Sequence, residues 1–164
     1  DTLKPSVQSF VSAYNALMTA INGQTKVSST GDASTTKGAA LTGDASMRAL
    51  VTSVRNELVR SSGSGSMTML SQMGINTVQT TGLLELDSAK WDKAVAKNPA
   101  EIAKVFTGDT GLIKRMTKAT DAYAGTTGIL ASRTTNLNAQ LTGLTEQQEA
   151  LDRKSTRLNS SHLP

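Results

Sequence analysis

The chain has 164 residues, of which 37% are hydrophobic and only 3% aromatic, and this composition favours long helices with narrow apolar stripes over a large globular core. It contains no cysteine, which excludes disulfides and thiolate metal sites. Its formal net charge of +4 comes from scattered basic residues, and no apolar run is long enough to span a bilayer, so we expect neither nucleic-acid binding nor membrane insertion.

The first predicted element is a helix over residues 2–22. Its apolar residues recur at alternating spacings of four and three, the pattern of a heptad seam: Leu3, Val7, Phe10, Tyr14, Leu17 and Ile21. Val11 and Met18 widen this seam by one column. The dipeptide at 22–23, Asn-Gly, predicts the end of the helix, because glycine readily adopts the left-handed backbone of a C-terminal cap. We expect the seam to pack against a partner helix.

A loop and a second helix follow. Residues 24–41 are rich in Ser, Thr, Gly and Ala, and we expect a mobile loop because they have too few large apolar side chains to offset the entropy of ordering. Asp44 is placed to cap a helix over about 44–60. The apolar stripe of this helix consists of Met47, Leu50, Val51, Val54 and Leu58. Residues 61–66, which are all serine or glycine, predict a flexible link.

Residues 70–87 predict a β-hairpin. Side chains alternate between apolar and polar around Ile75, and the Thr-Thr-Gly sequence at 80–82 is a turn signal between the two strands. Met67, Met69 and Met73 lie near the start of this segment, and we interpret them as gap-filling core residues.

Two short helices should follow the hairpin. Asp87 is placed to cap the first of them, which has Trp91 and Val95 on its inner side. Pro99 suits the first turn of the second helix, which should run through Phe106, because proline lacks the N–H that would be unpaired there.

Two further helices complete the pattern. A helix over about 111–124 carries Leu112, Ile113, Met116, Ala119 and Tyr123. In a long helix over about 129–154, leucines lie seven apart, with one more at an intervening position: Leu130, Leu137, Leu144 and Leu151, and Leu141. A coiled-coil seam and an ordinary amphipathic helix inside one domain both remain open, because three heptads are the lower limit for a coiled coil. Residues 155–164 break the pattern and resemble translated vector sequence, so they carry no functional inference.

The basic residues are densest at two places: Lys114, Arg115 and Lys118, and then Arg153, Lys154 and Arg157. Because no aromatic residues interleave with either group, we interpret both as solvated helix faces.

Few residues could support catalysis or metal binding. The one histidine, His162, lies in the segment that breaks the pattern, so the commonest general base is missing from the rest of the chain. Glu85 with Asp87, and Glu146 with Glu149, form carboxylate pairs, but a helix cap and solvent-facing helix charges explain them better. We therefore expect no enzyme, no catalytic residues, no metal site and no cofactor.

Four stretches, read in order, resemble one family. They are FVSAYNALMTAING at 10–23, ALTGDASMRALVTSVRNELV at 40–59, LSQMGINTVQTTGLLELDSAKWDKAVAKNPAEIAKVFTG at 70–108 and GILASRTTNLNAQLTGLTEQQEALDRK at 128–154. The chain is similar over nearly all of residues 1–154 to the C-terminal region of flagellar hook-associated protein 2, the filament cap protein. The stretch from the hairpin to NPAEIAKVF is the most specific part.

The resemblance implies a mainly α fold with a small β-hairpin (α+β), an elongated helical bundle or coiled-coil leg region of a multidomain cap subunit. The expected parts are residues 1–60 with the heptad helix, loop and second helix, 61–108 with the hairpin and short helices, 109–154 with the long heptad helix packing on the leg, and 155–164 as a non-native tail. The two sets of seam residues, in the first and the long helix, should hold the leg together.

The resemblance also implies a structural subunit that is secreted through the flagellar export channel and acts at the filament tip. Its implied partners are further copies of itself in a homo-oligomeric cap, flagellin, other hook-associated proteins and an export chaperone. The cap would promote flagellin insertion and polymerisation. An adhesin or surface-binding module at the flagellar tip is the alternative, although this chain has few aromatic residues suited to stacking on sugars.

Overall fold

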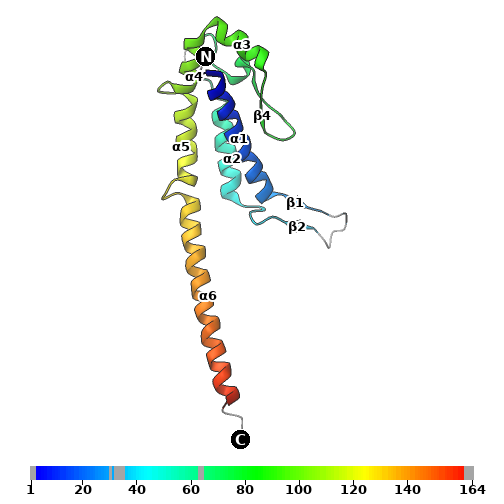
Figure 1. Ribbon diagram of the computed structural model, residues 1–164, viewed down its shortest axis with the longest axis vertical. Coiled ribbons are helices and arrows are strands. Elements are labelled where there is room, and N and C mark those ends of the chain that lie inside the picture. Colours follow the sequence, from blue (N-terminus) through cyan, green and yellow to red (C-terminus); the bar gives the residue numbers. More distant parts are fainter. Residues whose placement is uncertain (1–2, 30, 32–35, 63–64, 161–164) are drawn as a thin grey trace. The chain divides into compact units, whose positions relative to one another are not determined.

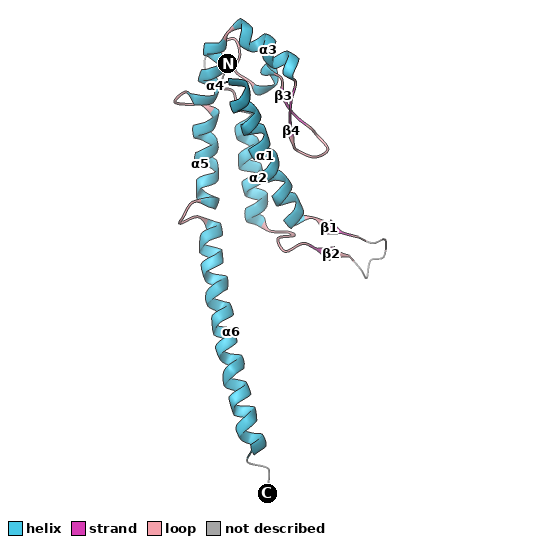
Figure 2. Cartoon of the chain, viewed as in Figure 1, coloured by secondary structure: helices cyan, strands magenta, loops and turns pink. Residues whose placement is uncertain are grey.

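The computed structural model describes residues 3–29, 31, 36–62 and 65–160. These residues are mainly helical and include two small antiparallel strand pairs, as Figures 1 and 2 show, which confirms the predicted α+β class. The chain divides into two compact units, one through Thr120 and one from Asp121 onward.

The first unit is built on two helices that lie side by side, α1 (Leu3–Thr25) and α2 (Ala45–Val59) (Figure 1). The buried residues of α1 are Val7, Val11, Tyr14, Met18 and Ile21, and those of α2 are Met47, Leu50, Val54 and Leu58. Both stripes follow the helical spacing that the sequence predicts. Leu3, Phe10 and Leu17 are half-buried at the margin of the α1 stripe.

The predicted end of the first helix at Asn22-Gly23 is wrong, because α1 continues to Thr25. Gly23 does not have a positive φ, so it does not form the left-handed cap. In the last turn the hydroxyl of Thr25 donates to the carbonyl of Ile21 (2.8 Å).

The segment expected to be a mobile loop contains a strand pair at its two ends. β1 (Val27–Ser28) pairs antiparallel with β2 (Lys37–Gly38). Backbone bonds extend the pairing, since Ala39 N donates to Lys26 O at 2.9 Å. Both strands are exposed, so backbone pairing orders these ends without apolar burial. Residues 30 and 32–35 of the expected loop lie outside the described residues.

The predicted cap of α2 is confirmed, and the predicted flexible link after it is wrong in part. Asp44 accepts hydrogen bonds from the backbone N–H groups of Ser46 (2.8 Å) and Met47 (3.0 Å). Beyond α2, Ser62 is only 3% exposed, and its N–H donates to Thr68 O at 2.8 Å. Residues 63–64 of the link lie outside the described residues.

The predicted hairpin is confirmed. After a 3₁₀ turn, η2 (Leu70–Met73), strands β3 (Ile75–Thr77) and β4 (Leu84–Leu86) pair antiparallel, with Asn76 opposite Glu85. Gly82 ends the connecting turn at φ 71°, a left-handed conformation that favours glycine. Of the three methionines near this segment, Met73 is fully buried, whereas Met69 is 46% exposed.

Helices α3 (Ser88–Lys97) and α4 (Pro99–Thr107) begin where the sequence predicts. The Asp87 carboxylate accepts from Lys90 N (3.0 Å), and the Asn98 side chain accepts from Glu101 N (3.4 Å). Pro99 occupies the first turn of α4. The two helices bury Trp91, Ala94, Ile102 and Val105 in the core of the first unit.

Helix α5 (Leu112–Ala124) is followed by α6 (Ile129–Ser160). The predicted end of the long helix at Lys154 is therefore six residues too early. Residues 155–160 contain neither proline nor glycine, so nothing in their composition stops the helix, and the hydroxyl of Thr156 donates to Asp152 O, one turn earlier, at 2.9 Å. The origin of residues 155–164 stays a prediction.

Candidate interaction surfaces

The candidate sites among the described residues are an exposed helix face, two polar clusters and an apolar pocket. Within the described residues, no group of three or more His, Asp or Glu side chains is placed to hold a metal ion. None of the helices in this part of the chain is both long and apolar enough to cross a bilayer. Of the carboxylates considered above, Asp87 caps α3. His162 lies outside the described residues.

The leucines of α6 form a row of exposed apolar side chains. Leu137, Leu141, Leu144 and Leu151 are 62–67% exposed. Leu130 is half-buried. Exposed apolar side chains that line up along one helix face are typical of a surface that another polypeptide covers. We call this set the α6 leucine stripe.

Several residues of helix α6 weaken it. Gly143 lies in its interior, where glycine is less favourable than alanine by about 0.5–1 kcal/mol. Several threonine hydroxyls donate to the carbonyl four residues earlier, as Thr134 does to Leu130 O (2.9 Å) and Thr145 to Leu141 O (2.9 Å). Such bonds slightly weaken a helix, so a partner that covers the α6 leucine stripe would stabilise it.

The six expected seam residues of α1 lie in or beside the core of the first unit. Val7, Tyr14 and Ile21 are buried, whereas Leu3, Phe10 and Leu17 are half-buried. The structure therefore brings the α1 residues into one core and leaves all but one of the five predicted α6 residues exposed. The joint role of the two sets in holding a leg together stays a prediction.

A polar residue of α1 ties this helix to the hairpin. Asn15 donates to Leu84 O (2.8 Å) and accepts from Leu84 N (2.7 Å). Val78 N donates to Leu83 O, so the next residue of the chain, Leu84, directs its backbone groups away from β3. One side-chain amide thus satisfies both outward-facing backbone groups of Leu84. Tyr14 adds a hydrogen bond from its hydroxyl to Gly82 O (3.0 Å).

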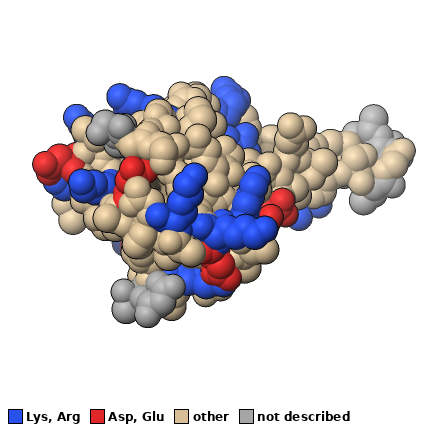
Figure 3. Space-filling model, turned by 90° about the horizontal axis from the view of Figure 1, so that it is seen from above, with Lys and Arg blue, Asp and Glu red and all other residues tan. Residues whose placement is uncertain are grey.

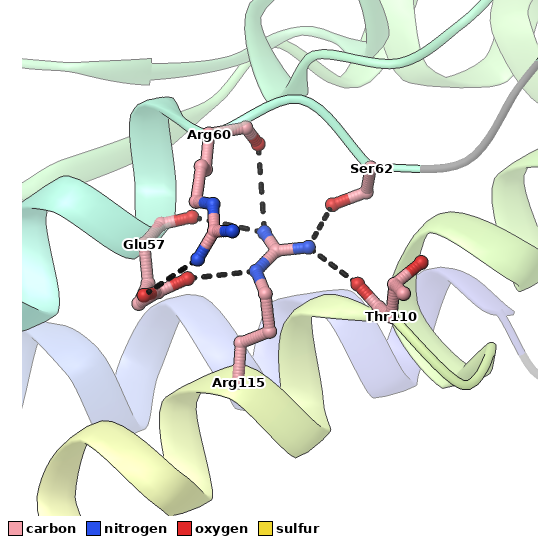
Figure 4. Close-up of polar contacts among 5 residues, drawn as sticks. All are labelled: Glu57, Arg60, Ser62, Thr110 and Arg115. Carbon is pink, nitrogen blue, oxygen red and sulfur yellow. Dashed lines mark hydrogen bonds and ion pairs between the residues drawn. The ribbon is translucent and has the colours of Figure 1, made fainter.

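A second polar cluster joins the start of α5 to the end of α2 (Figure 4). The guanidinium of Arg115 donates to the Glu57 carboxylate at 2.7 Å and to the hydroxyl of Ser62 at 2.6 Å. It also donates to three backbone carbonyls, those of Glu57 (3.1 Å), Arg60 (3.4 Å) and Thr110. The carbonyls of Glu57 and Arg60 belong to the end of α2, where helical carbonyls lack partners within the helix.

The Arg115 cluster contradicts the interpretation of Lys114, Arg115 and Lys118 as a solvated face. The side chain of Arg115 is 12% exposed and that of Glu57 is 18% exposed. Nothing in the local sequence indicates this, because Glu57 and Ser62 lie 58 and 53 positions away along the chain. The neighbouring Lys114 does lie in solvent, 60% exposed, and binds Asp109 at 2.7 Å. That hydrogen bond and the positive charge of Lys114 hold the pKa of the Asp109 carboxyl below its ordinary value of 3.8.

Basic side chains elsewhere are spread over the surface. Figure 3 shows Lys and Arg side chains across one face, with Asp and Glu side chains and uncharged surface between them. One ion pair on the surface joins the ammonium group of Lys4 to the carboxylate of Asp92 at 2.7 Å. Binding of single-stranded nucleic acid needs exposed aromatic rings among the basic groups, whereas Phe10, Trp91 and Phe106 are buried or half-buried.

An apolar pocket of about 150 Å³ lies among α1, α3, α4 and α5. Phe106 contacts both Phe10 and Trp91 edge-on, with ring centroids 6.2 Å and 6.1 Å apart. Trp91 is 1% exposed, and its indole nitrogen has no hydrogen-bond partner among the described residues. Apolar contacts alone therefore hold this side chain in place.

A family model described as the C-terminus of flagellar hook-associated protein 2 matches residues 1–162. The chain belongs to this family. Curated hook-associated protein 2 relatives include the B-type protein of Pseudomonas aeruginosa, which is 41% identical over 95% of this chain and 33% of its own length. The Salmonella typhimurium protein is 29% identical over 88% of this chain and 32% of its own length.

A solved structure agrees with the assignment to the hook-associated protein 2 family. The chain is similar to the D1-D2-D3 domains of the flagellar cap protein FliD from Escherichia coli, with a TM-score of 0.70 and 29% sequence identity. The match covers 83% of this chain and 36% of that chain. The chain thus spans about a third of the length of the relatives that it matches.

Proposed function

We propose that this chain is part of a structural subunit of a flagellar filament cap, which promotes the insertion and polymerisation of flagellin at the filament tip. The observation that carries the proposal is the match of nearly the whole chain to the hook-associated protein 2 family, together with its similarity to a solved flagellar cap protein. The subunit would act outside the cell as a homo-oligomer, with flagellin, other hook-associated proteins and an export chaperone as its partners.

The two units suit different tasks in such a subunit. The first unit has a fixed core, which Asn15 and Arg115 reinforce through long-range hydrogen bonds. The second carries the α6 leucine stripe, which is apolar and exposed. In the proposed cap, the first unit is the rigid part, and the α6 leucine stripe is covered by another helix of the assembly.

The first test is deletion of the full-length gene in its flagellated host, followed by an assay of flagellin in the medium. Flagellin that leaks out unpolymerised, with short or absent filaments and rescue by the intact gene, supports the proposal. Normal filaments and normal motility contradict it, and an adhesin or another surface protein would then be favoured.

Complementation with a double variant tests the stripe. Leu137→Asp with Leu144→Asp places two charges on the α6 leucine stripe, and we expect it to fail to restore filaments. The control is Thr135→Asp with Thr142→Asp, which adds the same charge on the opposite side of α6, about 160° away at about 100° per residue. All four positions are exposed in this chain, so both variants should keep the helicity of the parent. Equal rescue by both variants would exclude a role for the stripe.

A further inference from the structure

The apolar pocket is built entirely within the first unit. Its lining comes from the first turns of α1, from Trp91 of α3, from the end of α4 and from Ile113 at the start of α5. The α1 side contributes Leu3, Val7 and Phe10, and the α4 side contributes Phe106. The start of α1 and three consecutive helices much later in the chain therefore converge on one apolar space.

The inner wall of the pocket is packed within the first unit. Val7 and Trp91 are 3% and 1% exposed, and the edge-on contacts of Phe106 hold the aromatic rings in place. The rim is different: Ile113 is 44% exposed, and Leu3 and Phe10 are half-buried. An apolar cavity of about 150 Å³ can hold a benzene-sized group. The pocket thus has the size and character to take one large apolar side chain.

The position of the pocket indicates where that side chain comes from. The chain matches the C-terminal part of its family and only about a third of the length of its relatives, so most of a full-length relative lies outside this chain. Polypeptide that leads into α1 arrives at Leu3, which lines the pocket. A residue that precedes Leu3 by a short tether has an effective concentration near the pocket in the millimolar range, so even a weak contact with the pocket is populated.

We propose that a large apolar side chain (Leu, Ile, Met or Phe) from the polypeptide that precedes α1 in the full-length protein occupies this pocket. The contact would anchor the remainder of the subunit to the core of the first unit. Burying such a side chain and the rim at Ile113 removes apolar surface from water, which is the driving force for the contact. The inference rests on family membership and on the geometry of the pocket, and it is independent of the proposed role in the cap.

Thiol labelling of the full-length protein tests the proposal. Ile113→Cys introduces a thiol on the rim, and the peptide that carries it holds no other cysteine because residues 1–164 contain none. Thr117→Cys, one turn further along α5 and also exposed, is the matched control outside the pocket. The rate of maleimide modification is followed by mass spectrometry of the peptide that carries each thiol. We expect the thiol at position 113 to react at least about 10-fold more slowly than the thiol at position 117 in the native protein, and equally fast in denaturant.

A second rim position guards against a local effect of the substitution at 113. Thr107→Cys lies across the pocket on α4 and should show the same protection. Equal labelling of the rim and control thiols in the native protein would overturn the proposal.

Cross-linking identifies the occupant. A benzophenone maleimide attached to the thiol of the Ile113→Cys variant should cross-link within the same chain to a peptide that precedes α1. A cross-link to a second copy, or only to residues within the described range, would overturn the assignment even if the thiol is protected.

Discussion

Replacing Arg115 by alanine removes the guanidinium that ties the start of α5 to the end of α2. The variant loses the ion pair with Glu57 and the hydrogen bonds to Ser62 and to three carbonyls. Removing one partner of a buried ion pair typically destabilises by about 3–5 kcal/mol, because the other charge stays buried. Here the Glu57 side chain is 18% exposed, and Arg60 remains 3.5 Å from it, so we expect the lower end, about 3 kcal/mol.

Urea unfolding followed by the fluorescence of Trp91 measures this loss. Trp91 is the only tryptophan of the chain and lies in the first unit, so its emission reports on the unit that contains Arg115. With a slope of about 2 kcal/mol per molar urea, a loss of about 3 kcal/mol lowers the midpoint by about 1.5 M.

Lys114→Ala is the matched control for Arg115→Ala. It removes the same charge from the adjacent position of the same helix, but the ion pair of Lys114 with Asp109 is exposed, and we expect almost no change in the midpoint. Arg115→Lys keeps the charge and loses the planar fork of donors, so it should fall between the parent and Arg115→Ala. If Arg115→Ala and Lys114→Ala shift the midpoint equally, the cluster does not stabilise the first unit and the reasoning is refuted.

Three further predictions concern single side chains. Asn15→Ala leaves both backbone groups of Leu84 without their partner and should destabilise the first unit by about 1–3 kcal/mol in the same urea assay. A midpoint equal to that of the parent would contradict the role of Asn15 in holding Leu84. Trp91→Ala should destabilise the first unit by about 3–5 kcal/mol. Trp91→Phe should cost much less, because the indole N–H has no hydrogen-bond partner to lose among the described residues. Thermal unfolding followed by circular dichroism compares the two variants. By NMR, the pKa of the Asp109 carboxyl should lie below 3.8 in the parent and return toward this ordinary value in Lys114→Ala. The contribution of the Asp109–Lys114 pair to stability is therefore present above pH 3.8 and is lost as the pH falls through the lowered pKa.

The features that the sequence predicted correctly depend on local chemistry. Asp44 and Asp87 cap helices because their carboxylates reach N–H groups two or three residues away, and Pro99 starts α4 for a similarly local reason. The buried stripes of α1 and α2 follow from helical spacing alone. Gly82 ends the turn of the hairpin because its own backbone is left-handed there.

The features that the sequence did not predict depend on contacts between distant segments. Ser62 belongs to a run of serine and glycine that is typical of a linker, yet it is buried against Arg115, which lies 53 positions away. Asn15 is a polar residue of a helix, and its role becomes visible only when Leu84 is placed beside it. The pairing of β1 with β2 uses backbone groups, which every residue has, so composition could not reveal it.

Because a single side-chain amide satisfies both outward-facing backbone groups of Leu84, the chemical lifetime of that amide limits how long this link between α1 and β4 stays intact. Deamidation would turn Asn15 into a carboxylate, which has no hydrogen to donate and would repel the carbonyl of Leu84. A subunit aged in this way would retain its helices but hold β4 less firmly against α1.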